Sequence, residues 1–293
     1  LLCGRPEVKF RFVQDHRETF RVGKMCKVLQ VSRSGFYAWC RRGPSERKQA
    51  NEKLAEEIRE IHRANRRAYG SPRIYRELRS RGHHCGRHRV AQIMRLEGIR
   101  GCSKQRFYRT ATVRAERKAA PDLLAREFAV EAANRVWVGD ITQIRTREGW
   151  LFLAVILDLY SRKVVGHATS NRPRTELALD ALHLAHSARR PKPGLIHHSD
   201  RGSQYGSDQY QDQLKRYKMR CSMSRPGKCG DNAVAESFFR TIKTESLYHM
   251  DLQTREEARL AVFDYIEGFY NRTRMHSTLD YQSPEEYERL SAA

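Results

Sequence analysis

The sequence predicts an α/β protein in which a mixed-sheet core follows two all-helical domains. Three observations lead to this fold class. The first 120 residues hold 31 of the 56 lysines and arginines but only 11 of the 34 acidic residues. Their apolar residues recur at helical spacing. From residue 121 onward, β-rich runs alternate with helical patterns in the order βββ-α-β-α-β-α, which is not a simple alternating chain.

The charge distribution predicts a polyanionic partner. The whole chain carries a formal net charge of +22, and about +20 of it lies in the first 120 residues. A charge that served only solubility would not be segregated so sharply, so the basic half is expected to bind nucleic acid. With 39% apolar residues, the chain can still bury a core.

Residues 1–45 are expected to form a first helix-turn-helix. Two short helices are predicted within 18–40, separated by a turn at 31–35 that supplies an N-cap. The second of these helices is basic and aromatic, and Arg33 at its start is a candidate DNA contact. An ordinary helical hairpin would give the same pattern, so that alternative stays open.

Residues 46–100 are expected to form a second helix-turn-helix domain. A polar linker at 41–52 precedes a helix at 52–66, and Ser71 with Pro72 predicts the start of another helix. In the helix predicted at 86–96, Arg87 and Arg89 can face outward towards phosphates and base edges. The alternative is a structural bundle with a solvated basic face.

Residues 101–120 form a basic linker with no apolar period, read as an extended arm along DNA or as a disordered segment. Seven cysteines without a CxxC pair argue against a disulfide framework or a zinc site. There is no apolar run of membrane-spanning length, no signal-peptide pattern and no nucleotide-binding glycine motif. A cytoplasmic protein without a membrane partner is therefore expected.

Residues 121–290 are expected to form the catalytic core with its C-terminal helices. Strands are predicted at 136–144, 150–159, 163–169, 194–199 and 219–223. Helices are predicted at 174–188, 207–217, 232–247 and 254–270, with a last short helix from residue 283. In such a sheet the first and fourth strands are neighbours.

Three carboxylates stand out in this core. Asp140 lies in the middle of an apolar strand, where an unpaired charge is costly, and Asp200 ends the neighbouring strand. Glu236 shares one helix face with Arg240 and Lys243. Close carboxylates repel unless a cation lies between them, and a few oxygen ligands suit Mg²⁺ or Mn²⁺. Two such ions can support in-line displacement at phosphorus.

Other polar residues near this region are weighed differently. Asp158 is interpreted as a structural acid at a strand end, and Asp231 as the cap of the helix that carries Glu236. His197 and His198 are expected to be structural or to face DNA. His276, in the turn at 271–276, is a candidate DNA contact or a neighbour of the site.

The segments WVGDIT, HHSDRGSQY and NAVAESFFRTIK resemble the three catalytic blocks of the DDE integrase and transposase superfamily, which has an RNase H-like core. Asp200 and Glu236 are separated by 35 residues, a spacing familiar from that superfamily, and Lys243 occupies the position of its basic DNA contact. Together with DLYSRKVVG and the tail FYNRTRMHSTLDYQSPEEY, the chain resembles the second-frame protein of bacterial insertion sequences of the IS-three type.

This resemblance implies that Asp140, Asp200 and Glu236 are catalytic residues and ligands for two Mg²⁺ or Mn²⁺ ions. It also implies double-stranded DNA partners, namely the terminal inverted repeats and target DNA, and at least a dimer on the paired ends. The implied activity is DNA cleavage and strand transfer by a protein made as part of a frameshift fusion, which would suit a start at Leu1.

Three rival functions are weighed. A regulator with an inactive core is disfavoured by three intact carboxylates. A nuclease without strand transfer would not need two DNA-binding blocks, and a retroelement integrase would usually carry a zinc-binding HHCC module, which is not found here.

Overall fold

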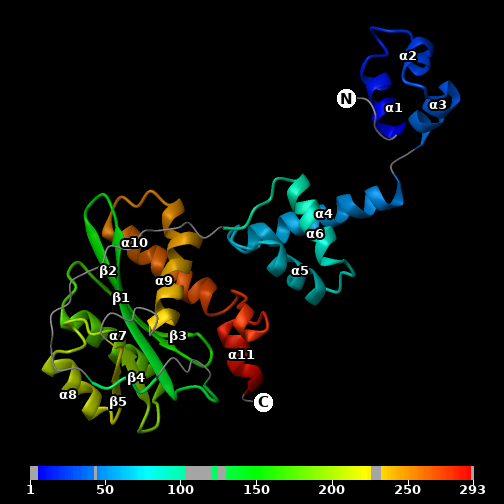
Figure 1. The fold of residues 1–293 in the computed structure, drawn as a ribbon. Helices are drawn as coiled ribbons and strands as arrows, with labels where there is room; N and C mark the ends of the chain where they lie inside the picture. Colours follow the sequence, from blue (N-terminus) through cyan, green and yellow to red (C-terminus); the bar gives the residue numbers. More distant parts are fainter. Residues whose placement is uncertain (1–5, 43–44, 103–119, 125–129, 226–231, 292–293) are drawn as a thin grey trace. The chain divides into compact units, whose positions relative to one another are not determined.

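The computed structural model describes residues 6–42, 45–102, 120–124, 130–225 and 232–291. The chain divides into two compact units, residues 1–59 and 60–293, whose elements are labelled in Figure 1. The predicted basic arm at 101–120 falls mostly on residues 103–119, outside these ranges. No helix in the described ranges is long and apolar enough to cross a membrane.

The first unit contains three short helices around a small core. They are α1 (Pro6–Asp15), α2 (Val22–Val28) and α3 (Arg33–Arg41). Val13, Met25 and Phe36 are among the residues that form the buried cluster. The predicted cap of α3 is confirmed, because the Ser32 hydroxyl accepts a hydrogen bond from the Gly35 N–H at 2.9 Å. Helix α1 was not predicted, and Val13 is its one buried residue.

Helix α4 (Glu46–Ala64) corrects the predicted linker at 41–52. It begins six residues earlier than the predicted helix. The Glu, Arg, Lys, Gln and Ala residues at its start are strong helix formers, so their polarity alone does not indicate a loop. The Ser45 hydroxyl also accepts a hydrogen bond from the Lys48 N–H at 3.3 Å, which caps the first turn.

The helical part of the second unit continues with α5 (Ser71–Ser80) and α6 (Arg87–Leu96). Both helices bury the apolar faces predicted from their spacing, with Ile74, Leu78, Val90, Ile93 and Met94 all buried. Pro72 lies in the first turn of α5, as predicted. The N-cap, however, is Gly70 and not Ser71, and no side chain caps the helix there.

The core of the second unit is a five-stranded mixed sheet. Its strands are β1 (Val136–Arg145), β2 (Trp150–Asp158), β3 (Val164–Ser170), β4 (Ile196–Ser199) and β5 (Arg220–Met223). The strand order is β3-β2-β1-β4-β5. The first three strands are antiparallel, whereas β4 runs parallel to both β1 and β5. The predicted neighbourhood of the first and fourth strands is therefore confirmed.

The sheet is flanked by α7 (Thr175–Arg189), α8 (Asp208–Arg216), α9 (Ala233–Glu245), α10 (Arg255–Phe263) and α11 (Pro284–Ser291). The helix predicted at 254–270 consists of two parts: the α-helix α10 is followed directly by a π-helical segment, η3 (Asp264–Tyr270). Two single 3₁₀ turns are η2 (Leu247–His249) and η4 (Ser277–Leu279). The Thr254 hydroxyl caps α10, since it accepts a hydrogen bond from the Glu257 N–H at 3.1 Å.

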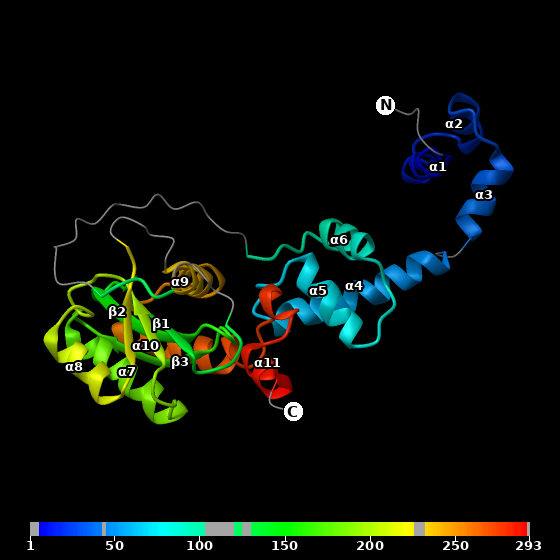
Figure 2. The ribbon, with the colours of Figure 1, turned by 60° about the horizontal axis from the view of Figure 1, so that its bottom comes forward.

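The two faces of the sheet have different roles. Trp137 of β1 belongs to the apolar cluster that α7 and α8 complete. Thr142, whose side chain projects from the other face by strand alternation, contacts Lys243 of α9. Figure 2 shows α9 on one side of the sheet and α7 on the other. Side chains at even-numbered positions of β1 therefore lie under α9.

Gly166 allows α7 to lie directly on β3. A Cβ added at this glycine would lie 2.7 Å from the backbone nitrogen of Ala185 and within collision distance of the Ala181 carbonyl oxygen. Gly166→Ala is therefore expected to lower the free energy of unfolding by about 1–3 kcal/mol, because backbone atoms cannot rotate away. Urea denaturation measures this loss. Gly23→Ala, which meets nothing within 4 Å, is the matched control, and an equal loss in both variants would contradict the explanation.

A buried ionic network joins the helical part of this unit to its C-terminal segment. Glu245, at the end of α9, accepts hydrogen bonds from Arg274 at 2.6 and 2.7 Å and from the Tyr265 hydroxyl at 2.8 Å. Arg73 of α5 lies 3.8 Å from the same carboxylate and donates to the Met275 carbonyl. This network ties α5 to the helix that carries Glu236.

Candidate active site

Asp140 and Asp200 stand at equivalent positions of two neighbouring parallel strands. Val136, Trp137 and Val138 of β1 pair with Ile196, His197 and His198 of β4. The same offset places Asp140 beside Asp200, one residue beyond the end of β4, at the usual strand separation of about 4.8 Å. Both carboxylates are partly exposed, close to the end of β4.

Backbone contacts orient both side chains. The Asp140 carboxylate accepts from the N–H of Ile141, and the Asp200 carboxylate accepts from the N–H of Gly202, both at 2.8 Å. A Cβ added at Gly202 would lie 2.8 Å from the Asp200 carboxylate oxygen, so a larger residue here would push that carboxylate out of its present position. The glycine in the motif therefore keeps the approach to Asp200 open.

Glu236 lies on the face of α9 that crosses β1. At one end of this face, the Asn232 amide donates to the Gly139 carbonyl at 3.2 Å. At the other end, the Lys243 ammonium donates to the Thr142 hydroxyl at 2.7 Å. Glu236 is four residues after Asn232 and seven before Lys243, so it shares their helix face. The two contacts bracket Glu236 on the helix and Asp140 on the strand.

The electrostatics of nearby groups reflect the two aspartates. Tyr205 is buried, and its hydroxyl has no hydrogen-bond partner among the residues that the structure describes. Burial raises the pKa of Tyr205 well above its ordinary value, and the negative charges of Asp140 and Asp200 raise it further. Both carboxylates thus act on one hydroxyl. Burial lowers the pKa of Lys243, while the charge of Asp140 opposes that shift.

The donor set fits a hard divalent cation. Two partly exposed carboxylates in adjacent strand positions, with a third on the covering helix, are oxygen ligands of the kind that Mg²⁺ and Mn²⁺ prefer. Within the described ranges, however, no three His, Cys, Asp or Glu side chains are gathered closely enough to hold an ion. Glu236 follows shortly after residues 226–231, which lie outside those ranges, as does the predicted cap Asp231.

The predicted DNA contacts differ in exposure. Arg33, Arg87 and Arg240 are exposed, and Arg89 is partly exposed. His276 is only 8% exposed. Its ring lies edge-on to Tyr270 at 4.8 Å and its Nε2 is 3.4 Å from Arg274. Because these neighbours enclose the ring, we do not retain His276 among the proposed DNA contacts.

The structural roles predicted for Asp158 and the two histidines are confirmed. Asp158 is fully buried and accepts from the N–H groups of Asn134 and Tyr160 at 2.7 and 2.9 Å. His197 shares a hydrogen bond with the Tyr210 hydroxyl at 3.0 Å. His198 is held between the hydroxyls of Ser222 and Ser224. All three side chains are buried in the sheet and form hydrogen bonds with protein groups, although His197 Nδ1 has no hydrogen-bond partner among the described residues.

Buried His197 predicts a loss of stability in mild acid. Burial lowers its pKa from 6.5 to about 3. The unfolded chain therefore takes up a proton below about pH 6.5 that the folded chain refuses until about pH 3, so stability falls as the pH drops through this window. The slope contributed is at most about 1.4 kcal/mol per pH unit. Urea unfolding between pH 7 and 4 should show a shallower fall for His197→Gln than for the wild type. Parallel curves would contradict this origin.

Sequence reasoning did not single out three further residues of the site. The Asn232 and Lys243 side chains hold α9 against Gly139 and Thr142 of β1. The Tyr205 hydroxyl, in the turn that follows Asp200, is affected by the charges of both aspartates. Lys243 was predicted as a DNA contact, whereas no role in the site was predicted for the three further residues, Thr142, Asn232 and Tyr205. Their polarity inside motifs that otherwise supply apolar packing is the signal that could have identified them.

Comparison with known proteins agrees with this architecture. An integrase core domain matches residues 130–229, and a second integrase core domain model matches residues 217–284. An HTH-like domain matches residues 49–107. The match at 49–107 covers the region expected to hold the second helix-turn-helix.

Two relatives decide the family. The chain is 40% identical over 288 residues to the transposase InsF for insertion sequence IS3A of Escherichia coli K12, covering 98% of this chain and all of the relative. It is 43% identical over 272 residues to an uncharacterized 31 kDa protein of insertion element IS600 from Shigella sonnei, covering 92% and 100%. The chain belongs to the IS3 family of insertion-sequence transposases. This transposase is thus an enzyme of the polynucleotidyl transferase class with an RNase H-like core.

More distant similarity is found among solved structures. A simian T-cell lymphotropic virus intasome in complex with PP2A regulatory subunit B56 gamma is 16% identical, with a TM-score of 0.45, over 79% of this transposase and 74% of that chain. The HTLV-2 integrase catalytic core domain in complex with magnesium gives 16% and 0.40, over 53% and 97%. These similarities are too remote to bear on the chemistry of the site.

Proposed function

We propose that this transposase cuts and joins DNA strands at a site formed by Asp140, Asp200 and Glu236, with two Mg²⁺ or Mn²⁺ ions. Bound ions would activate the attacking hydroxyl group and stabilise the leaving oxygen. The parallel pairing of β1 with β4 is the observation that carries the proposal, because its register, continued by two residues, puts the Asp140 and Asp200 carboxylates side by side.

The reaction would proceed in two displacements at phosphorus. In the first, a water oxygen bonds to phosphorus and the bond from phosphorus to the 3′ oxygen breaks, which frees a 3′-hydroxyl. In the second, that hydroxyl attacks another phosphodiester, so that one P–O bond forms and one breaks. The residues of the chain orient these groups: Asp140 and Asp200 from the sheet edge, and Glu236 from α9.

The basic residues would deliver the DNA. Lys243 and exposed Arg240 follow Glu236 along α9 and are suited to the phosphates of the strand being cut. Arg33, Arg87 and Arg89 lie on the two predicted recognition elements, which we propose bind the terminal inverted repeats of the element. Two ends must be held together, so we propose at least a dimer, working on nucleoid DNA in the bacterial cytoplasm.

A strand-joining assay tests the proposal. The wild-type protein is incubated with DNA that carries the ends of its parent element, with and without Mg²⁺. Nicked and joined products are expected only when Mg²⁺ is present. Binding without any cleavage would overturn the proposal in favour of a DNA-binding regulator. Nicked products without joined products would show that the protein acts as a nuclease and does not transfer strands.

A further inference from the structure

A groove continues from the proposed site along β1. It has a volume of about 680 Å³ and lies between the β1–β2 hairpin and the segment from the end of α9 through η2 towards α10. Gln143, Arg145 and Trp150 line it from the hairpin, and Lys243 and Tyr248 line it from the other side. Asp140 is about 7 Å along the strand from Thr142 and about 16 Å from Arg145, a reach of a few nucleotides.

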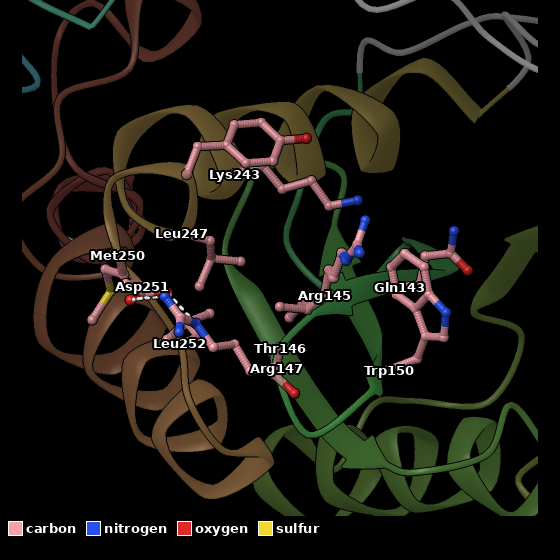
Figure 3. A pocket seen from close by; sticks show the side chains of 12 residues that line it. Gln143, Arg145, Thr146, Arg147, Trp150, Lys243, Leu247, Met250, Asp251 and Leu252 are labelled. Carbon is pink, nitrogen blue, oxygen red and sulfur yellow. Dashed lines mark hydrogen bonds and ion pairs between the residues drawn. The ribbon is translucent and has the colours of Figure 1, made fainter.

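The groove has an excess of positive charge. Asp251, the one carboxylate among the described residues that line the groove, is paired with Arg147 at 2.7 Å. Arg145 is exposed, and its side chain has no hydrogen bond or ion pair to any other residue of the described ranges. Figure 3 shows the side-chain ends of Lys243 and Arg145 pointing towards the same space from different elements. Two cations that converge without a carboxylate between them are suited to a phosphate.

The groove also presents large aromatic surfaces. Trp150 is 45% exposed and Tyr248 is 51% exposed. Trp150 and Gln143 both line the groove from the hairpin side (Figure 3). Aromatic faces next to cations are the combination by which proteins hold unpaired nucleotides, since every base can stack on an aromatic ring. In a duplex the bases are stacked on each other and cannot use these faces.

We propose that this groove binds the unpaired DNA strand that flanks the phosphodiester being cut. Trp150 and Tyr248 stack on its bases, and Arg145 with Lys243 contacts its phosphates. The inference rests on the proposed function in taking DNA as the substrate, and it adds a single-stranded segment next to the site. It further implies that the end of the element is opened over a few nucleotides when it is bound.

Binding measurements without a divalent metal test the groove separately from catalysis. The probes are a blunt duplex, the same duplex with a short unpaired thymine extension, and the extension with its bases removed. The wild type should bind the thymine extension about tenfold more tightly than the blunt duplex, and the abasic extension should lose most of that gain. Trp150→Ala should abolish the preference, whereas Trp150→Phe should keep it.

Arg145→Gln should weaken binding of both extended probes and lower the salt dependence by about one counterion. Arg216→Gln, an exposed arginine of α8, is the matched control and should change nothing in the preference. Equal wild-type affinity for all three probes would overturn the inference, as would an equal loss on every probe in Trp150→Ala. If the protein joins strands but shows no preference for the extended probe, the groove proposal is wrong and the proposed function stands. If it shows the preference but joins no strands, the groove proposal stands and the proposed function is wrong.

Discussion

Replacing Asp200 by asparagine is expected to lower Mg²⁺-dependent cleavage and joining by at least about a thousandfold, because several kcal/mol of transition-state stabilisation depend on ion binding. Asparagine keeps the shape of the side chain and can still accept from the Gly202 N–H, so the turn should be preserved. What it removes is the negative charge that offsets the cations. Gel assays of nicked and joined products, with DNA binding measured in parallel, give the result.

Asp140→Asn should behave in the same way, since the two carboxylates share one strand register. Asp212→Asn is the matched control, because Asp212 is an exposed residue of α8 paired with Lys215. The control should cut and join like the wild type. If Asp200→Asn still joined strands at more than a tenth of the wild-type rate, the assignment of this carboxylate to catalysis would be wrong.

The β1–β2–β3 meander and the neighbourhood of β1 and β4 could be predicted from the sequence, because they depend on local patterns. Apolar runs separated by short turns predict the antiparallel β1–β2–β3 meander, and the following helix predicts a crossover to a parallel strand. Asp140 lies in the middle of β1 and Asp200 directly after β4, and the register that pairs Val138 with His198 brings the two together.

Long-range contacts could not be predicted in this way. His276 looked accessible in a polar turn, but Tyr270 and Arg274 enclose it. The early start of α4 depended on helix propensity in a segment that lacks apolar residues. The groove unites Trp150 and Tyr248, nearly a hundred residues apart, and neither belongs to a motif. Each of these features depends on which surfaces meet, and a periodicity in one segment carries no information about its distant partner.

The buried network around Glu245 predicts the largest effect on stability. The side chains of Glu245 and Arg274 are only 8% and 7% exposed. Burial by itself would lower the pKa of Arg274, but the hydrogen bonds and charge of Glu245 raise it above its ordinary value. Glu245→Gln leaves the guanidinium buried without a counter-charge, with Arg73 close by. The expected loss is about 3–5 kcal/mol in the free energy of unfolding, measured by urea denaturation.

Two further variants show whether the loss comes from the unpaired charge or from the shape of the site. The double variant Glu245→Leu, Arg274→Met removes both charges and should recover much of the stability, because the pair itself adds little beyond a well-packed apolar replacement. Glu256→Gln breaks an exposed pair with Arg259 and should cost less than about 0.5 kcal/mol. A double variant no more stable than Glu245→Gln would contradict the charge argument. Glu236 and Glu245 lie on the same helix. The strand-joining activity of Glu245→Gln, measured at a temperature well below its melting temperature, should therefore be lower than that of the wild type and of Glu256→Gln.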